Sequence, residues 1–138
     1  MNMSDTGLKL LMLREGSRHN AYQDTKGIWT IGVGHTGPEV VEGLIWTDKQ
    51  VMDQLAIDIG KAENCINSLV KVPLTTNQFD ALASFIFNVG CHAFETSTML
   101  RDLNAGNYIK AAADFDMWHI PPSIIGRRDS ERDQFKSQ

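Results

Sequence analysis

Apolar residues recur at intervals of three and four along most of this chain, the spacing that places them on one face of an α-helix. The first such segment predicts a helix that is capped by Asp5 and ended by Gly16, where a left-handed glycine would stop it. A longer segment opens with Thr47 and Gln50, spaced as a capping box, and predicts a helix of about 24 residues, roughly 36 Å long. Its apolar stripe consists of Val51, Leu55, Ile59, Ala62, Ile66 and Leu69.

The second half of the chain is also predicted to be helical. Thr75 and Gln78 form another capping box ahead of FDALASFIFNVG, and Gly90 ends that segment. Two shorter helices are expected at residues 98–103 and 108–118, before two prolines interrupt the pattern. A final helix contains GRRDSERDQF.

One short region, GIWTIGVGH, has the two-residue period of a β-strand. The bulky face consists of Trp29, Ile31 and Val33, and the opposite face of Thr30, Gly32 and Gly34. Because glycine in a strand often marks the close approach of another group, we expect the second face to be nearly bare and the Thr30 hydroxyl to be open to a ligand. DTKG has the residues of a turn, so a hairpin with a preceding strand is predicted.

Composition places the chain among ordinary globular domains. Its 138 residues are 42% hydrophobic and 22% charged, which fits one domain with a sizeable core. A formal charge of -4 and the absence of a concentrated basic face argue against nucleic-acid binding. Arg127, Arg128 and Arg132 alternate with acidic residues, a pattern typical of a solvated helix face.

The remaining chemistry-bearing residues give weaker signals. Cys65 and Cys91 are too few and too far apart for a disulfide framework or a metal site, and we interpret them as buried free thiols. The histidines lack the paired spacing of metal ligands, so no metal or other cofactor is expected. The apolar stretch near the N-terminus is too short for a signal peptide or a membrane anchor, so no stable membrane insertion is expected.

Two carboxylic residues in REGSRHNAYQDTKGIWTIGVGHTG differ in their expected surroundings. Glu15 falls in the last turn of the first predicted helix, where the helix dipole disfavours its charged form. Asp24 falls at an open polar turn, which favours the ionised form. Hydrolysis of a glycosidic bond needs such a division between a proton donor and an ionised carboxylate. From spacing alone, however, a glutamate at a helix end and an aspartate at a turn are more often structural.

The same segment resembles the catalytic segment of phage lysozymes, the endolysins of glycoside hydrolase family 24. In that family a glutamate is followed after eight residues by Asp or Cys and after five more by Thr, and Glu15, Asp24 and Thr30 match this spacing. LTTNQFDALASFIFNVG, FETSTMLRDLNAGNY and GRRDSERDQF are similar to later segments of the family, in the same order. The segment WHIPPSIIG departs from many relatives in being shorter and richer in proline.

This resemblance implies a mostly α, α+β, two-lobed lysozyme-like fold. The expected single catalytic domain covers residues 1–138, with a small β-hairpin lobe at about 15–46 and a helical lobe at about 70–138 that includes the N-terminal helix. A long helix would join the lobes, and peptidoglycan would lie in the cleft between them.

The implied activity is a muramidase that hydrolyses the β-1,4 bond between N-acetylmuramic acid and N-acetylglucosamine and lyses the host cell. Glu15, Asp24 and Thr30 would be the catalytic residues. The alternative is an inactive wall-binding or structural module of the same fold. The resemblance further implies a monomer that stays in the host cytoplasm until a holin releases it to the periplasm.

Three other residues are candidates for a role, and two of them, Asn88 and Arg127, have two readings each. Asn88 is interpreted either as a substrate ligand or as a helix C-cap residue. Arg127 matches a family arginine that pairs with the catalytic glutamate, which implies a positioning or substrate-binding role, and a simple surface pair with Glu131 one turn on is equally favoured. His35 is expected to hold the hairpin to the rest of the protein through a hydrogen bond.

Overall fold

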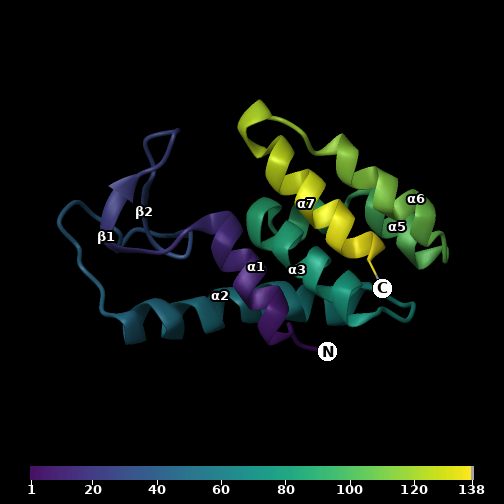
Figure 1. Ribbon diagram of the computed structural model, residues 1–138, viewed down its shortest axis with the longest axis horizontal. Helices are drawn as coiled ribbons and strands as arrows, with labels where there is room; N and C mark the ends of the chain where they lie inside the picture. Colours follow the sequence, from purple (N-terminus) through teal and green to yellow (C-terminus); the bar gives the residue numbers. More distant parts are fainter. Residues whose placement is uncertain (138) are drawn as a thin grey trace. The chain divides into compact units, whose positions relative to one another are not determined.

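The computed structural model describes residues 1–137 and has the α+β, mostly helical architecture that the sequence predicts. The elements are α1 (Asp5–Glu15), β1 (Arg18–Gln23), β2 (Trp29–Gly32), β3 (His35–Thr36), α2 (Asp48–Leu69), α3 (Thr76–Val89), α4 (Cys91–Glu95), α5 (Thr98–Asn104), α6 (Tyr108–Asp114), the 3-10 turns η1 (Phe115–Met117) and η2 (Pro122–Ile124), and α7 (Ile125–Lys136) (Figure 1).

The chain divides into two compact units. The sheet unit, Lys9–Gly60, holds most of α1, the three strands and the first part of α2. The helical unit combines Met1–Leu8 with the chain from Lys61 onward. The segment 15–46, which the sequence predicts as the small lobe, lies inside the sheet unit.

The sheet has the antiparallel order β1-β2-β3. Its short β2–β3 connection centres on Val33, between two glycines with positive φ, Gly32 at 63° and Gly34 at 65°. Such backbone angles favour glycine, because a side chain would collide with the backbone. The buried apolar residues of this unit are Leu11, Ile31, Val33, Val40, Val51, Leu55 and Ile59.

The face of β2 that the sequence predicts to be bare is covered. A Cβ atom on Gly32 would lie 3.3 Å from the ring of Trp46, and Thr30 is only 4% exposed. The glycine therefore makes room for an aromatic ring of the same unit, and the expectation of an open Thr30 face is wrong.

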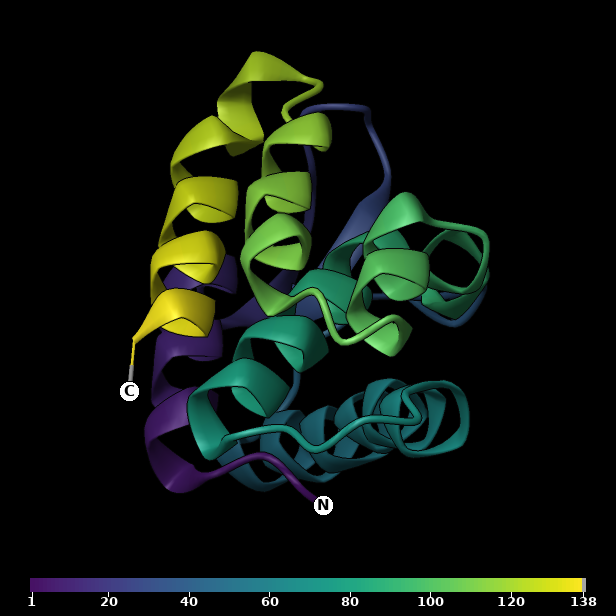
Figure 2. The same ribbon diagram turned by 90° about the vertical axis from the view of Figure 1, so that its right-hand side faces the viewer.

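In the helical unit, α3 packs against α7, and α5 packs against α6. Figures 1 and 2 show α6 and α7 side by side. The core is built mainly from apolar residues of α2, α3 and α5, and it includes edge-on contacts of the Phe85 ring with Phe94 and Phe115.

Most of the predicted helix ends are confirmed. Both capping boxes are present, Thr47 with Gln50 and Thr75 with Gln78, and Gly90 is the C-cap of α3. The predicted cap at Asp5 is wrong, because Ser4 precedes the helix and its Oγ accepts a hydrogen bond from the backbone N of Gly7 at 3.0 Å.

The interpretation of Cys65 and Cys91 as free thiols is also wrong. The two residues form a disulfide between α2 and the first residue of α4, with Cα atoms 5.9 Å apart. Cys65 is buried and Cys91 is exposed. Their separation of 26 residues in sequence gave no sign that the fold would bring them together.

Within residues 1–137, none of the helices combines the length and the apolar character that a membrane crossing requires.

Candidate active site

Glu15 is the last residue of α1 and is half-buried in the sheet unit. The helix ends there because Gly16 takes the left-handed conformation, with φ 76°, while its N–H still donates to the carbonyl of Met12 at 2.8 Å. This termination agrees with the sequence-based prediction and fixes the point at which the Glu15 side chain leaves the backbone.

The carboxyl group of Glu15 lies directly against Gly34. A Cβ atom on Gly34 would come within 2.7 Å of Glu15 Oε2 and 3.1 Å of Cδ, which is closer than real Cβ contacts allow. Gly34 is favoured by its positive φ, and a side chain at this position would push the Glu15 carboxyl group aside. The β2–β3 turn forms one wall of the surroundings of Glu15.

Asp24 lies at the turn between β1 and β2 and is held by the backbone. Its Oδ1 atom accepts hydrogen bonds from the N–H groups of Lys26 at 2.8 Å and Ile28 at 2.9 Å. This is the local bonding by which aspartate stabilises turns. Within residues 1–137, Asp24 Oδ2 accepts no hydrogen bond, so one oxygen anchors the side chain and the other can bind water.

Thr30 lies in β2, opposite Tyr22 of β1 and Thr36 of β3. Its Oγ1 donates to the carbonyl of Ile28 at 3.0 Å. The hydroxyl hydrogen is thereby used within the hairpin, and the oxygen retains the capacity to accept.

The other two predicted site residues belong to the helical unit, so the structure brings together Glu15, Asp24 and Thr30 in one unit and Asn88 and Arg127 in the other. Asn88 lies in the last turn of α3, and its Oδ1 accepts from Arg128 Nη2 at 2.5 Å. Since Gly90 is the C-cap, the reading of Asn88 as the cap is wrong.

Arg127 pairs with Glu131 one turn on, as one of its two readings predicts. Its Nε donates to Glu131 Oε2 at 3.1 Å, and its Nη2 donates to the carbonyl of Ser84 at 2.9 Å. The Arg127 side chain is only 10% exposed and that of Glu131 is fully buried, so this is not a surface pair.

The solvated helix face predicted around Arg127 is therefore wrong. Arg128 is fully buried, with its guanidinium 4.8 Å above the Phe85 ring and bonded to Glu131. Burial lowers the pKa of Arg128, and the neighbouring charge of Glu131 opposes that effect. The spacing of Arg128, Glu131 and Phe135 at i, i+3 and i+7 was the available signal, because it places two charged residues on the same stripe as a core phenylalanine.

One group of side chains has metal-ligand chemistry. Ligand atoms of Asp116, His119 and Asp129 lie within 4.8 Å of one another. Arg132 Nη1 already lies 2.9 Å from Asp116 Oδ1 and 3.4 Å from Asp129 Oδ1, so a cation of the protein itself neutralises these carboxylates. The cluster is explained as an ion-pair network.

The sheet unit thus holds two carboxyl groups in unlike surroundings. One packs against a glycine backbone at a helix end, and the other is fixed by two N–H groups at a turn. Such a division is what acid-assisted hydrolysis of a glycosidic bond uses, so fold and site define the class of lysozyme-like glycoside hydrolases.

Comparison with known proteins identifies the family. The phage lysozyme family matches residues 13–131. The endolysin of Salmonella phage P22 is 44% identical over 145 residues, covering 99% of each chain. Among solved structures, the endolysin of Escherichia coli O157:H7 phage FAHEc1 aligns with a TM-score of 0.91 and 32% identity, covering 99% of this chain and 94% of that one. The muramidase domain of SpmX from Asticaccaulis excentricus aligns with a TM-score of 0.88 and 37% identity, covering 99% of each chain.

The chain belongs to the phage lysozyme family. It is a muramidase, a glycoside hydrolase of the endolysin type that acts on the bacterial cell wall. The alternative reading as an inactive module of the same fold is not favoured.

Proposed function

We propose that Glu15 is the general acid of this muramidase. The observation that carries the proposal is the packing of its carboxyl group against Gly34, which shields one side of the carboxyl and fixes its position. The oxygen that leaves the sugar needs a proton at neutral pH, and a positioned carboxylic acid supplies it. The same spacing of Glu15, Asp24 and Thr30 in the family motif supports this role.

Asp24 and Thr30 act on the attacking water in this proposal. Asp24 holds its carboxylate in place through Oδ1 and offers Oδ2 to the water or to the positive charge that develops on the sugar. Thr30 has already donated its hydrogen to Ile28, and the residue is only 4% exposed, so its oxygen accepts a hydrogen bond from a single water held within the site and not from a ligand that lies along the strand.

In this proposal Asn88 binds the substrate, and Arg127 helps to position the residues around it. A guanidinium group only donates, so the atom of Asn88 that faces Arg128 is the oxygen, and the amide NH₂ is left to donate to a sugar or acetamido oxygen. Arg127 is held by Glu131 and by the backbone of Ser84, which suits a residue that positions others.

The proposal extends to the setting of the reaction. The enzyme works as a monomer, waits in the host cytoplasm and reaches peptidoglycan in the periplasm through a holin. Nucleic acid is not a partner, in keeping with a net charge of -4.

Glu15→Gln tests the catalytic assignment. Glutamine keeps the size of the side chain and its ability to hydrogen-bond but cannot give up a proton. The purified variant should fold, bind insoluble peptidoglycan and clear chloroform-treated Gram-negative cells at least about a hundredfold more slowly than the wild type. Glu95→Gln, the same change on the exposed surface of α4, should clear at the wild-type rate. Clearance by Glu15→Gln near the wild-type rate would show that Glu15 is not the acid.

A further inference from the structure

The contact between Glu15 and Gly34 makes the position of the β2–β3 turn important for the proposed acid. A displacement of this turn moves the wall against which the Glu15 carboxyl rests. Catalytic groups need placement to within about 0.5 Å, and an error of about 1 Å can cost about a hundredfold in rate. The residues that fix the turn therefore bear on the chemistry as well as on stability.

His35, the residue after Gly34, is bonded at both ring nitrogens. Its Nδ1 lies 2.7 Å from Asp58 Oδ2, and its Nε2 lies 2.7 Å from Glu39 Oε1. The side chains of His35 and Asp58 are 13% and 15% exposed, whereas that of Glu39 is 56% exposed. The shielded contact is therefore the one to Asp58, and it confirms the expectation that His35 anchors the hairpin through a hydrogen bond.

Asp58 connects this anchor to a helix. It lies in α2, and its other oxygen accepts a hydrogen bond from Gln54 Nε2 one turn earlier, at 3.0 Å. The orientation of the carboxylate that holds His35 is thus set within the helix itself.

A second contact holds the other side of the turn. Trp46 lies with its ring 5.6 Å from the His35 ring, and its edge packs against Gly32. The Val33 turn is therefore fixed on one side by the contact of Trp46 with Gly32 and on the other by the hydrogen bond between His35 and Asp58.

We infer that His35 and Asp58 are positioning residues of the hydrolysis. Asp58, which lies in α2, holds His35, and His35 keeps the neighbouring Gly34 against the Glu15 carboxyl. The inference rests on the proposed role of Glu15. Neither residue touches the substrate in this account, since both act through the backbone of Gly34. A purely structural contact between His35 and Asp58 would lower the stability when broken but would leave the turnover rate of the folded molecules unchanged.

Asp58→Asn separates these two roles. Asparagine still accepts a hydrogen bond from His35 but removes the charge, so the turn is loosened while the helix remains intact. On soluble, uncross-linked peptidoglycan glycan chains, at a temperature where the variant is folded by circular dichroism, kcat should fall about tenfold or more, with KM within about twofold of the wild-type value.

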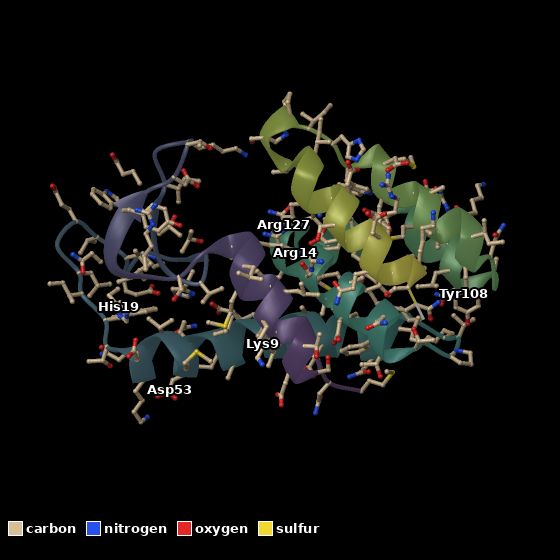
Figure 3. All side chains as sticks on the ribbon, viewed as in Figure 1. Lys9, Arg14, His19, Asp53, Tyr108 and Arg127 are labelled. Carbon is tan, nitrogen blue, oxygen red and sulfur yellow. A yellow bond between two sulfur atoms is a disulfide. The ribbon has the colours of Figure 1, made fainter. Side chains whose placement is uncertain are left out.

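The matched control is Asp53→Asn on the same helix. Asp53 pairs with Lys49 and is 61% exposed, and Figure 3 shows it on the side of α2 that points away from β1 and β2. This variant should keep the wild-type kcat. An equal loss in both variants, or an unchanged kcat in folded Asp58→Asn, would overturn the inference.

A double-mutant cycle with Gly34→Ala tests the route through the turn. The added Cβ displaces the Glu15 carboxyl directly, so its effect on kcat should be shared with that of Asp58→Asn and the two losses should not multiply. Fully multiplicative losses would contradict the inference.

If Asp58→Asn does not fold, Gln54→Ala is tested in its place, because this change removes only the hydrogen bond that orients the Asp58 carboxylate. It should lower kcat at least about threefold with KM unchanged, and an unchanged kcat would again contradict the inference.

These outcomes are distinct from failure of the proposed function. An active Glu15→Gln enzyme removes the assignment of the acid itself. An inactive Glu15→Gln enzyme, together with an unchanged kcat in Asp58→Asn, removes only the positioning role.

Discussion

Asp24 and Thr30 are anchored to the same residue of the β1–β2 hairpin. The N–H of Ile28 donates to Asp24 Oδ1 at 2.9 Å, and the carbonyl of Ile28 accepts from Thr30 Oγ1 at 3.0 Å. The two proposed water-handling groups therefore share one support. A change at either residue disturbs the hairpin as well as the chemistry, so each prediction needs a variant that separates the two effects.

Asp24→Asn should lower the rate of wall hydrolysis by orders of magnitude. The Asn oxygen can still accept from Lys26 and Ile28, so the turn should form, but the negative charge is lost. Asp24→Cys should lose much less, because the family motif admits Cys at this position. Turbidity loss of chloroform-treated cells measures both variants, and an Asn variant as active as the wild type would refute the role given to Asp24.

Thr30→Val should abolish lysis while costing about 1 kcal/mol of stability, since valine keeps the shape but removes the hydrogen bond to Ile28. Thr30→Ser restores the hydroxyl and should recover most of the activity. Urea unfolding and clearance rates are measured on the same preparations. Activity that follows stability alone in both variants would mean that Thr30 is only structural.

The disulfide between Cys65 and Cys91 should contribute about 3 kcal/mol to the free energy of unfolding, because it closes a loop across a sequence separation of 26 residues in the unfolded chain. Reduction of the wild type with dithiothreitol should lower the free energy of unfolding in urea by about that amount. Cys91→Ser, at the exposed end of the bond, should be as unstable as the reduced wild type and indifferent to reductant. A wild type whose stability does not respond to complete reduction would contradict this prediction.

Asp102 and Asp114 should make the helical unit less stable as the pH rises from about 4 to about 6. The Oδ2 atoms of Asp102 and Asp114 are buried, and within residues 1–137 neither has a hydrogen-bond partner, so a proton on Asp114 would let its carboxyl group donate to Asp102. Burial, followed by the hydrogen bond and the charge of Asp102, raises the pKa of Asp114 from 3.8 to about 6. The folded protein binds this proton more tightly than the unfolded chain, so the free energy of unfolding falls across that range by at most about 3 kcal/mol.

Asp114→Asn should remove this pH dependence and stabilise the protein by about 1 to 2 kcal/mol at pH 7.5, because the amide can donate to Asp102 without a charge. Urea unfolding at pH 4.5 and pH 7.5 gives both values. Glu95→Gln, an exposed change of the same kind, should leave the pH dependence as it is in the wild type. A variant that is less stable than the wild type at pH 7.5 would show that the pair does not share a proton.

The features that the sequence predicted correctly are local ones. The helix ends at Gly16 and Gly90 and both capping boxes depend on residues within a few positions of one another, so their spacing carries the information. The spacing of Glu15, Asp24 and Thr30, together with three later segments in the order of the family, was sufficient to predict the family, because each of these patterns lies within a short segment of the chain.

Several residues received their roles only from the tertiary structure. The pairing of Cys65 with Cys91 and the contact of Trp46 with Gly32 each join separate elements of a unit, and the burial of the Arg128–Glu131 pair of α7 depends on the elements packed over it. The i, i+3, i+7 spacing of Arg128, Glu131 and Phe135 places the pair on the same helix stripe as a core residue, but the sequence does not show whether that stripe is covered. The burial of the pair depends on whether other elements exclude water from it, and only the packing of α3 against α7 decides that.

The Glu15 site combines both kinds of information. The sequence by itself determined that a glutamate ends a helix and that glycines follow in the hairpin, because helix termination and tight turns are set by local backbone energetics. The tertiary structure alone decided that Gly34 is the glycine against which the carboxyl rests, and that His35 is tied to α2 through Asp58. These contacts join residues that are distant from one another along the chain, and no local preference specifies which distant groups will meet when the apolar faces are buried.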